Sequence, residues 1–457
     1  MRRWDENEAG AAVLPGLVPG SRRRSLASRN RDLVSSGIPA RPAPGRERRN
    51  PFSFNAYGRP WPGWLRGTQK VKFFHAERAP ANRPDVVLSR VAIQHFRNLG
   101  VQELEIPPEG VAIVGENAQG KSNVVEAVYY LETFRSFRRA PDDQLVDFGE
   151  DVFRIVGAAH DREGIPRTVT AAFDRRARRK KVTLDGAEPA KVGDALGSLG
   201  AVVFSPADVA VVSEGPAERR RFLDVVLSLN APGYLRALQR FRQCLSQRNA
   251  CLKEGRGGGL ARAWDEGLVR TGAHVISERQ LWIERYGPSF SRFYAEVAGG
   301  REASLRYRPG VRLAGAWSRE AIEAAYHEAL RSSSETEIRT RTTMVGPQRD
   351  DMLITLGGDG RELEVREFGS GGQRRTAALA LRLAEAETIR EARGREPVIL
   401  VDDAFAELDA ARSERVLGLM EREETGQVIL TAPKESDVRL RREVLPRWTI
   451  QGGRIRT

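Results

Sequence analysis

Hydrophobic and polar positions divide the chain into a leading segment without periodicity and a longer part with regular patterns. Residues 1–85 show no sustained alternation, and the first ordered pattern starts near Val86. Residues 86–99 alternate between apolar and polar positions and then turn, which predicts a strand. Residues 110–115 form a short apolar run typical of a buried strand, and residues 121–134 have helical spacing. The ordered part is therefore expected to begin with strands and one helix.

The patterns that follow predict two further bodies. Residues 152–160, 168–173 and 181–186 look like strands separated by turns, which indicates a small antiparallel lobe. Residues 216–300 carry apolar side chains at three-to-four spacing, with a Gly-rich break at 255–259 where we expect a turn between helices. Strand patterns return after this helical stretch. We therefore expect an α/β fold with a small antiparallel lobe and an inserted short helical arm.

Residues 1–85 are expected to be a disordered, basic leader. They contain 10 of the 24 prolines and carry 17 Lys and Arg against 7 Asp and Glu, whereas the remainder carries 57 against 54. Such a composition disfavours a packed core. Two interpretations stay open. The leader is either a non-functional extension from an upstream start site or an arm that binds nucleic acid or a partner.

The overall composition is typical of a cytoplasmic protein. The chain has 457 residues, 40% of them hydrophobic and 30% charged, which allows two or three domains with a large core. No apolar run approaches the roughly 20 residues of a membrane span, so no membrane partner is expected. Cys244 and Cys251, the two cysteines, are interpreted as reduced thiols rather than a disulfide or a metal site.

The stretch GENAQGKS matches the phosphate-loop pattern G-x-x-x-x-G-K-[ST], between a predicted strand and a predicted helix. Backbone N–H groups of such a loop surround the β-phosphate of ATP. The Lys121 side chain reaches the β and γ oxygens, and the Ser122 hydroxyl binds Mg²⁺. The expected ATP-binding residues are Gly115, Glu116, Asn117, Ala118, Gln119, Gly120, Lys121, Ser122 and Asn123.

A second ligand for the magnesium ion, a carboxylate, is expected after residues 398–401. This apolar run predicts a buried parallel strand, and Asp402 and Asp403 follow it directly. Asp402 would hold Mg²⁺ through water, and Asp403 would orient or deprotonate the attacking water. Asp403 and Lys121 are thus the expected catalytic residues. The other interpretation is that the two acids cap the next helix.

Within residues 367–387, a segment poor in side chains (369–372) leads into a strongly helical run. Bare N–H groups at a helix N-terminus bind anions. A Ser-Gly-Gly-Gln element placed before the second carboxylate strand resembles the ABC-type ATPases. That resemblance implies that two protomers dock head to tail and that this element covers the γ-phosphate held by the partner. The residues concerned are Ser370, Gly371, Gly372 and Gln373.

The order and spacing of these motifs narrow down which group of ABC-type ATPases the chain resembles. Ser122 and Ser370 are 248 residues apart, too far for a compact transporter cassette and too close for the long coiled-coil arm of SMC proteins. A short helical arm between the motifs resembles the RecF family of bacterial DNA repair and recombination proteins. Further stretches between residues 86 and 433 follow that family's order: FRNL, GKSNVVEAVYYL, SFR, VVFSPADVAVVSEGPAERRRFLD, MVGPQRDDM and LVDDAFAELD.

The resemblance implies an ABC-ATPase-type P-loop head in three parts. Residues 86–212 would carry the P-loop and the β-lobe, residues 213–335 the arm, and residues 336–457 the signature and the second carboxylate strand. It also implies ATP and Mg²⁺ as cofactors, and an ATP-driven homodimer on single-stranded, gapped or junction DNA. Recombination mediator proteins would be partners in loading recombinase and in the SOS response. Weak, DNA-stimulated ATP hydrolysis would act as a switch.

The chain departs from the wider class at two positions. Residues 427–433 end a strand in Thr431 where transporter cassettes carry a histidine, and no glutamine stands at the usual magnesium-loop position, where residues 204–208 are found instead. Two alternatives to the RecF interpretation therefore remain. One is another short-armed SMC-like ATPase, and the other is a nucleotide-binding scaffold without turnover.

A basic stretch on a predicted hairpin is the candidate for DNA contact. Phosphate contact fits its density of charge, although a solvated turn fits equally well. Aromatic residues do not alternate with the basic ones, so we expect contact with the DNA backbone rather than with bases. The basic run at residues 218–222 is interpreted as structural. The DNA candidates are Arg175, Arg176, Arg178, Arg179, Lys180 and Lys181.

Overall fold

A computed structural model describes most of the chain after the leader. The described residues are 87–160, 164–254, 257–313, 315, 317–357, 362–403, 409–422, 426–434 and 445–457. The leader predicted at 1–85 lies outside them. Among the described residues, no helix is both long enough and apolar enough to cross a membrane.

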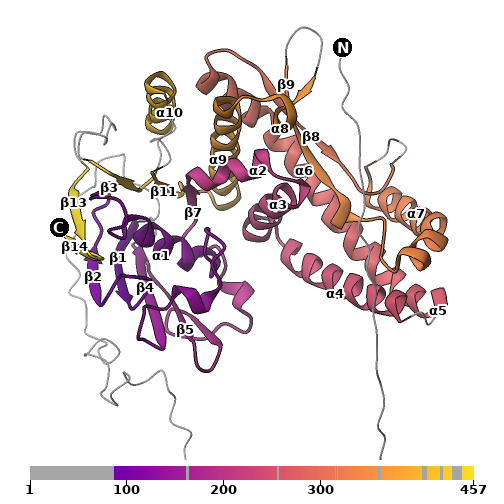
Figure 1. Ribbon diagram of the computed structural model, residues 1–457, viewed down its shortest axis with the longest axis horizontal. Helices are drawn as coiled ribbons and strands as arrows, with labels where there is room; N and C mark the ends of the chain where they lie inside the picture. The colour runs from indigo at the N-terminus through magenta and orange to yellow at the C-terminus, as the bar shows by residue number, and fades with distance from the viewer. Residues whose placement is uncertain are drawn as a thin grey trace, which may run out of the picture. The chain divides into compact units, whose positions relative to one another are not determined.

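A six-stranded sheet forms the centre of the nucleotide-binding part (Figure 1). Its order is β14-β13-β3-β12-β11-β7, and all neighbouring strands run parallel except β13 and β14. The strands are β3 (Gly110–Val114), β7 (Ala201–Phe204), β11 (Val398–Asp402), β12 (Val428–Ala432), β13 (Arg447–Gln451) and β14 (Arg454–Arg456). The carboxyl ends of β3, β12 and β11 therefore meet at one edge of the sheet.

Both faces of this sheet are covered, which explains the continuous apolar runs in its strands. In β11, Val398 and Leu400 pack in one hydrophobic cluster with helix α1 (Lys121–Thr133). The alternate residues Ile399 and Val401 belong to a second cluster, with the helices on the other face. Because successive side chains of a strand point to opposite faces, one short run serves two cores.

The predicted antiparallel lobe is a five-stranded sheet of order β2-β1-β4-β5-β6. Its strands are β1 (Val87–Gln94), β2 (Gln102–Glu105), β4 (Val152–His160), β5 (Pro166–Asp174) and β6 (Arg179–Leu184). Helix α1 packs against strands of both sheets, so most of its side chains are buried. Gln427 also links the two sheets, because its amide bonds the backbone of Leu88 in both directions, at 2.9 and 3.1 Å.

The predicted arm consists of helices, with α4 and α6 side by side and α7 against α6 (Figure 1). A three-stranded sheet, β10-β9-β8, pairs a strand that follows α6 with strands near the C-terminal motifs. The helices are α2 (Val209–Ser213), α3 (Pro216–Asn230), α4 (Tyr234–Lys253), α5 (Gly257–Arg262), α6 (Asp265–Ala298) and α7 (Arg319–Thr340). The strands are β8 (Ala303–Arg308), β9 (Asp351–Leu356) and β10 (Leu363–Glu364).

The remaining elements are short helices and the two helices that flank β11. The α-helices are α8 (Val365–Phe368), α9 (Gly371–Arg393) and α10 (Ala410–Arg422). The 3-10 helices are η2 (Asp142–Leu145), η3 (Val192–Ala195), η4 (Pro206–Asp208) and η5 (Pro347–Arg349). The Gly-rich break differs from the expected turn, since its last three glycines begin α5. The α/β fold with an antiparallel lobe and a helical arm is confirmed.

Buried ion pairs fasten the arm to the stretch MVGPQRDDM. Arg279 of α6 lies 2.6 Å from Asp350 and 2.7 Å from Asp224 of α3, measured between guanidinium nitrogens and carboxylate oxygens. The Tyr234 hydroxyl donates to Asp224 at 2.7 Å, and Tyr307 donates to Asp350. Burial raises the pKa of the Asp350 carboxyl, and the charge of Arg279 opposes that shift. This part of the motif is therefore structural.

We expect Arg279→Met to lower the free energy of unfolding by about 3–5 kcal/mol, because it leaves Asp350 and Asp224 buried with less compensation. Urea unfolding followed by circular dichroism measures the loss. Arg285→Met on the same helix is the matched control. Its exposed pair with Glu391, at 2.7 Å, is expected to contribute less than about 1 kcal/mol. Equal losses of unfolding free energy in the two variants would contradict the structural role of Arg279.

Candidate nucleotide-binding site

The loop GENAQGKS joins β3 to α1 at the carboxyl edge of the central sheet. The ammonium group of Lys121 folds back over the loop and donates to the carbonyl oxygens of Gly115 at 2.7 Å and Glu116 at 3.2 Å. A third contact, to Asn117 Oδ1, measures 3.4 Å. Lys121 is 4% exposed, so its charge is held inside the concave side of the loop. That is where a P-loop places phosphate oxygens.

Two glycines let neighbouring segments approach this loop closely. Gly120 has φ +109°, and a Cβ there would lie 2.7 Å from Asn98 Oδ1. A Cβ at Gly115 would lie 2.7 Å from the carbonyl oxygen of Ile450 in β13. The Asn98 amide also donates to the Gln119 carbonyl at 3.3 Å, and the Gly453 N–H donates to the same oxygen at 2.9 Å. The stretch FRNL and the C-terminal hairpin thus fix the shape of the loop.

Asp402 ends β11 close to the start of α1. The Ser122 hydroxyl lies near enough to its carboxylate to lower the pKa of Asp402, and Arg138 lies 3.9 Å from it. Burial raises the pKa of Asp402, while the Ser122 hydrogen bond and the Arg138 charge act in the opposite direction. A carboxylate and a hydroxyl in contact are the hard oxygen donors that Mg²⁺ prefers. These two residues therefore fit the metal expected for them.

Strand β12 lies between β3 and β11, and its residue Thr431 contacts both acids. Thr431 Oγ1 is 3.2 Å from Asp403 Oδ1 and 3.4 Å from Asp402 Oδ1, so its single hydroxyl proton can serve one of them at a time. The same oxygen accepts the Asp403 N–H at 3.0 Å. Asp403 has φ +48°, in the left-handed region, which the contact with Thr431 helps to hold. Asp403 is half-buried beside the loop edge.

The sequence did not assign a role to Thr431 or Arg138. The sequence pattern marks Thr431 only as a position without histidine, and its contact with the acids depends on the parallel register of β12 against β11, which places Thr431 opposite Asp402. Arg138 belongs to the stretch SFR and donates to Asn123 Oδ1 at 3.1 Å as well as facing Asp402. The stretch SFR was the signal in the sequence that could have pointed to Arg138. For Thr431 the sequence offered only its place at the end of a predicted strand.

The Ser-Gly-Gly-Gln element forms the N-terminus of α9. Ser370 is the N-cap: its Oγ accepts the Gln373 N–H at 3.3 Å, and Gln373 Oε1 accepts the Ser370 N–H at 2.7 Å. Ser370 and Gly371 are exposed, and a Cβ at Gly371 would meet no atom within 4 Å. Among the described contacts, none joins residues 370–373 to residues 115–123. Within one chain, the structure brings the P-loop and both acids together and leaves this element apart.

The six DNA candidates do not form one patch of unpaired charge. Arg175 donates to the Val146 carbonyl at 2.9 Å. Arg176 pairs with Asp151 at 2.6 Å, Lys180 with Asp142 at 2.9 Å, and Lys181 with Glu188 at 2.7 Å. Arg178, at a turn with φ +49°, and Arg179 are exposed and form no ion pair with a described residue.

Comparison with a family model gives a match over residues 87–451, to the family described as RecF/RecN/SMC N-terminal domain. A DNA replication and repair protein RecF from Geobacter metallireducens is 35% identical over 355 residues, covering 77% of this chain and 94% of that protein. A protein of the same description from Thermosynechococcus vestitus is 37% identical over 338 residues, covering 73% and 87%.

Solved structures agree with these matches. Two structures of the recombination mediator protein RecF in the RecFOR pathway, one described as RecF-ATP and one as RecF-ATPrS, have a TM-score of 0.74 to this chain. Each is 31% identical in sequence and covers 82% of this chain, and the match spans 98% of the RecF-ATPrS chain and 99% of the RecF-ATP chain. The similarity therefore extends over the head and the arm alike.

Proposed function

The chain belongs to the RecF family, and from that membership we propose that it is an ATP-binding recombination mediator that acts on DNA in replication and repair. The names of the matched relatives and structures support this role. The single observation that carries it is the meeting of Lys121, Ser122, Asp402 and Asp403 at one edge of the central sheet. This is the arrangement that phosphoryl transfer from a nucleotide requires.

In this proposal residues 115–123 bind the phosphates of ATP. Lys121 exchanges its carbonyl contacts for β and γ oxygens, which carry full negative charge and make stronger hydrogen bonds. Ser122 and Asp402 hold Mg²⁺, which neutralises charge on the phosphates when it is bound. Asp403, held by Thr431, would orient or deprotonate the attacking water. If Asp403 is not the base, Glu407 is the alternative, because it is the next acid along the sequence; it lies outside the described residues.

The second part of the proposal is an ATP-dependent homodimer. Ser370, Gly371, Gly372 and Gln373 form the N-terminus of α9, a helix of 23 residues, where Gly371 leaves the backbone exposed and the Arg412 guanidinium lies close to Gly372. Such a helix end attracts a phosphate. Since its own P-loop makes no described contact with this element, the γ-phosphate of a second protomer is the ligand we propose. Two such sites would close a head-to-tail pair.

Hydrolysis would then serve as a switch on DNA. ATP closes the pair on single-stranded, gapped or junction DNA, and slow hydrolysis opens it again. Asp403 is one methylene shorter than the glutamate found in transporter cassettes, which favours weak turnover. The closed pair would cooperate with other recombination mediator proteins in loading recombinase.

DNA binding and ATP hydrolysis of the full chain test this function. We expect ATP to increase its affinity for DNA, and DNA to increase its rate of hydrolysis. Single-stranded, duplex and junction DNA are compared with and without ATP and magnesium. ATP binding without turnover on any of the three would identify a scaffold, and ATP-independent DNA binding would contradict the switch.

We expect Thr431→Val to slow ATP hydrolysis roughly 10- to 100-fold while leaving ATP affinity within about threefold. The variant keeps the shape of the side chain and removes a hydroxyl that contacts a charged group, a contact worth about 1.5–3 kcal/mol. Single-turnover hydrolysis, measured separately from nucleotide binding, gives both values. Thr431→Ser restores the hydroxyl and should recover the rate. If Thr431→Ser also hydrolysed ATP slowly, the methyl group of Thr431 would be required for the rate.

A further inference from the structure

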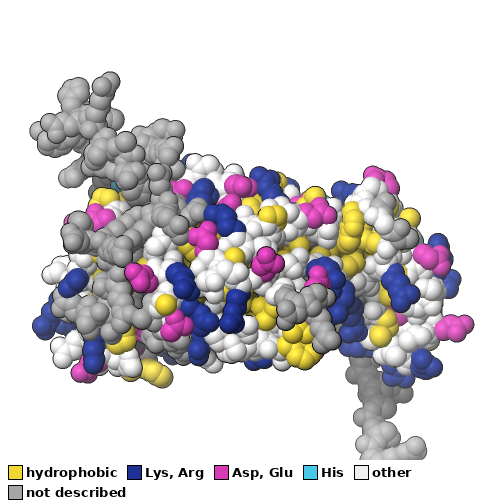
Figure 2. Space-filling model, turned by 90° about the horizontal axis from the view of Figure 1, so that it is seen from above, with side chains coloured by type: hydrophobic (Ala, Val, Ile, Leu, Met, Phe, Trp, Pro, Cys, Tyr) yellow, Lys and Arg dark blue, Asp and Glu magenta, His cyan; other side chains and the backbone are white. Residues whose placement is uncertain are grey.

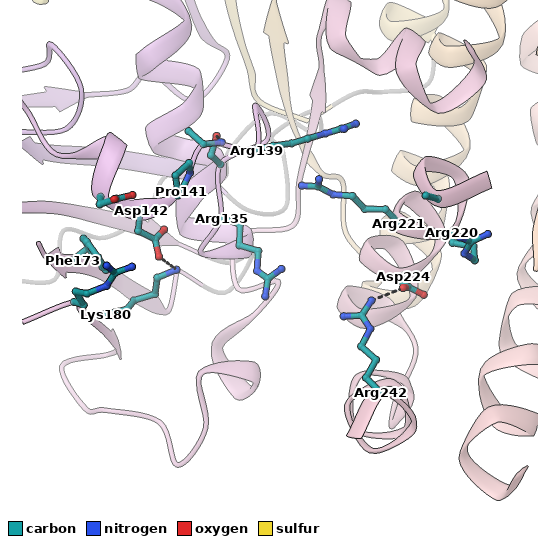
Figure 3. Close-up of a pocket in the computed structure, with 15 residues that line it drawn as sticks. Arg135, Arg139, Pro141, Asp142, Phe173, Lys180, Arg220, Arg221, Asp224 and Arg242 are labelled. Carbon is teal, nitrogen blue, oxygen red and sulfur yellow. Dashed lines mark hydrogen bonds and ion pairs between the residues drawn. The ribbon is translucent and has the colours of Figure 1, made fainter. Parts of the chain in front are cut away.

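A cavity of about 770 Å³ lies between the antiparallel lobe and the arm, and none of residues 115–123 lines it (Figure 3). One wall comes from the segment after α1 and from the hairpin β5–β6, and the other comes from α3 and α4. Figure 3 shows Arg135 and Lys180 on the first side, and Arg221 and Arg242 on the second. The basic residues that line it are Arg135, Arg139, Arg178, Lys180, Arg220, Arg221 and Arg242.

Positive charge exceeds negative charge in this cavity. Seven Lys and Arg face three Asp in the lining, and two of the three acids are already paired. Asp142 lies 2.9 Å from Lys180, and Asp224 lies 2.8 Å from Arg242 and 2.7 Å from the buried Arg279. Arg135, Arg178 and Arg221 form no ion pair within the described part of the chain. The cavity therefore holds a surplus of guanidinium groups.

The arrangement also places like charges near one another. Burial lowers the pKa of Arg221, and the neighbouring charge of Arg139 lowers it further, while Glu218, the ion-pair partner of Arg139, acts in the opposite direction. Burial and the charge of Arg279 lower the pKa of Arg220 in the same way. An anion between the two walls would relieve this repulsion. Guanidinium groups suit phosphate in particular, because their planar fork donates two parallel hydrogen bonds.

The lining favours a phosphate backbone over other anions. An acidic protein segment would need apolar anchors for stable binding, and the cavity offers only Ala140, Pro141, Ala217 and the edge of Phe173. A free nucleotide would gain from stacking on an aromatic ring, yet Phe173 is only 7% exposed. A nucleic-acid strand needs neither, because its phosphates supply sequence-independent affinity.

We infer that this cavity binds the backbone phosphates of a DNA strand between the lobe and the arm. The inference rests on the proposed function and places its DNA contact at two walls that only the fold brings together. Surface charge alone does not single out a location, since Figure 2 shows Lys and Arg spread over the visible face with Asp and Glu among them. Of the candidates from the hairpin, Arg178 and Lys180 belong to the cavity.

Two double variants test the cavity, one for each wall. Arg221→Gln with Arg242→Gln changes the arm, and Arg135→Gln with Arg178→Gln changes the lobe. For each lost phosphate contact we expect binding to labelled DNA at 0.1 M salt to weaken about five- to eightfold, and the slope of log affinity against log salt to fall by about 0.7–0.9. The loss should be similar for unrelated DNA sequences. Thermal unfolding shows whether the variants are folded.

The matched control removes two exposed arginines elsewhere, Arg285 and Arg306, so net charge falls equally. It should keep the salt slope of the unchanged protein. An equal loss in the control, or wild-type binding by both cavity variants, would overturn the inference while leaving the proposed function in place. If the unchanged protein itself bound no DNA, the proposed function would fail first. If only one of the two double variants weakened DNA binding, the DNA strand would not lie between the two walls.

Discussion

Ser370→Arg is expected to abolish ATP-dependent dimerisation while ATP binding stays nearly normal. Ser370 is exposed at the N-terminus of α9, and its hydrogen bonds lie within its own capping box. An arginine there would project from the surface where we propose that the partner's γ-phosphate docks. The P-loop of the same chain makes no described contact with this element and should still bind ATP. Sedimentation velocity with ATP and magnesium measures the dimer.

A second N-cap separates docking from simple capping. Ser318 caps α7, is exposed, and accepts the Ala321 N–H at 3.2 Å. Both Ser318→Arg and Ser370→Arg lose a cap and should cost about 1 kcal/mol of stability. Only Ser370→Arg should lose the dimer, by at least tenfold in dissociation constant. An ATP-dependent dimer that survives this change would falsify the trans role of Ser370.

Lys121→Ala is expected to weaken ATP binding by about 100-fold or more. The ammonium of Lys121 is held by the loop's own carbonyls, at 2.7 and 3.2 Å, and removing a partner from a desolvated charge pair costs about 2–5 kcal/mol. The fold should persist, because the Glu116 backbone that Lys121 contacts belongs to an exposed part of the loop and can bind water instead. Isothermal titration with ATP measures the affinity.

Lys253→Ala, an exposed lysine in the last turn of α4, is the control for loss of one positive charge. It should leave ATP affinity unchanged. A Lys121→Ala variant that binds ATP normally would contradict the site. A variant that unfolds would be judged by Lys121→Arg, which keeps the charge and should fold but bind ATP more weakly, because the guanidinium does not fit the same space.

Features that depend on neighbouring residues could be predicted from the sequence. The P-loop is such a feature, since a strand, a loop with glycines and a helix follow one another directly. The N-terminus of α9 is another, because Ser370 and Gln373 cap it across three residues. The antiparallel lobe and the helical arm followed from periodicity alone.

Features that depend on distant segments could not be predicted in this way. The contact of Thr431 with Asp402 and Asp403 requires β12 to pair with β11 in the register that places Thr431 opposite Asp402. Because Arg176 and Lys181 pair with acids, the charge of the dense basic stretch is partly neutralised. The cavity joins residues more than a hundred positions apart, from Arg135 to Arg242. No local pattern marks such a surface.

Cross-linking between two different chains tests the composite site most directly. Glu116→Cys places a thiol on the exposed part of the P-loop, and Gly371→Cys places one at the N-terminus of α9, where a new side chain meets no atom within 4 Å. Cys251 is changed to Ser in both chains, while Cys244 is buried. Each chain then carries one accessible cysteine, so a short bismaleimide can join the two sites only between protomers.

The mixture of these two chains is treated with the reagent with and without ATP and magnesium. We expect a covalent heterodimer that forms with ATP and not without it, and that disappears when Lys121→Ala is added to the Glu116→Cys chain. Full ATP binding by both chains with no ATP-dependent heterodimer would mean that the Ser370 element of one protomer does not dock on the nucleotide of its partner.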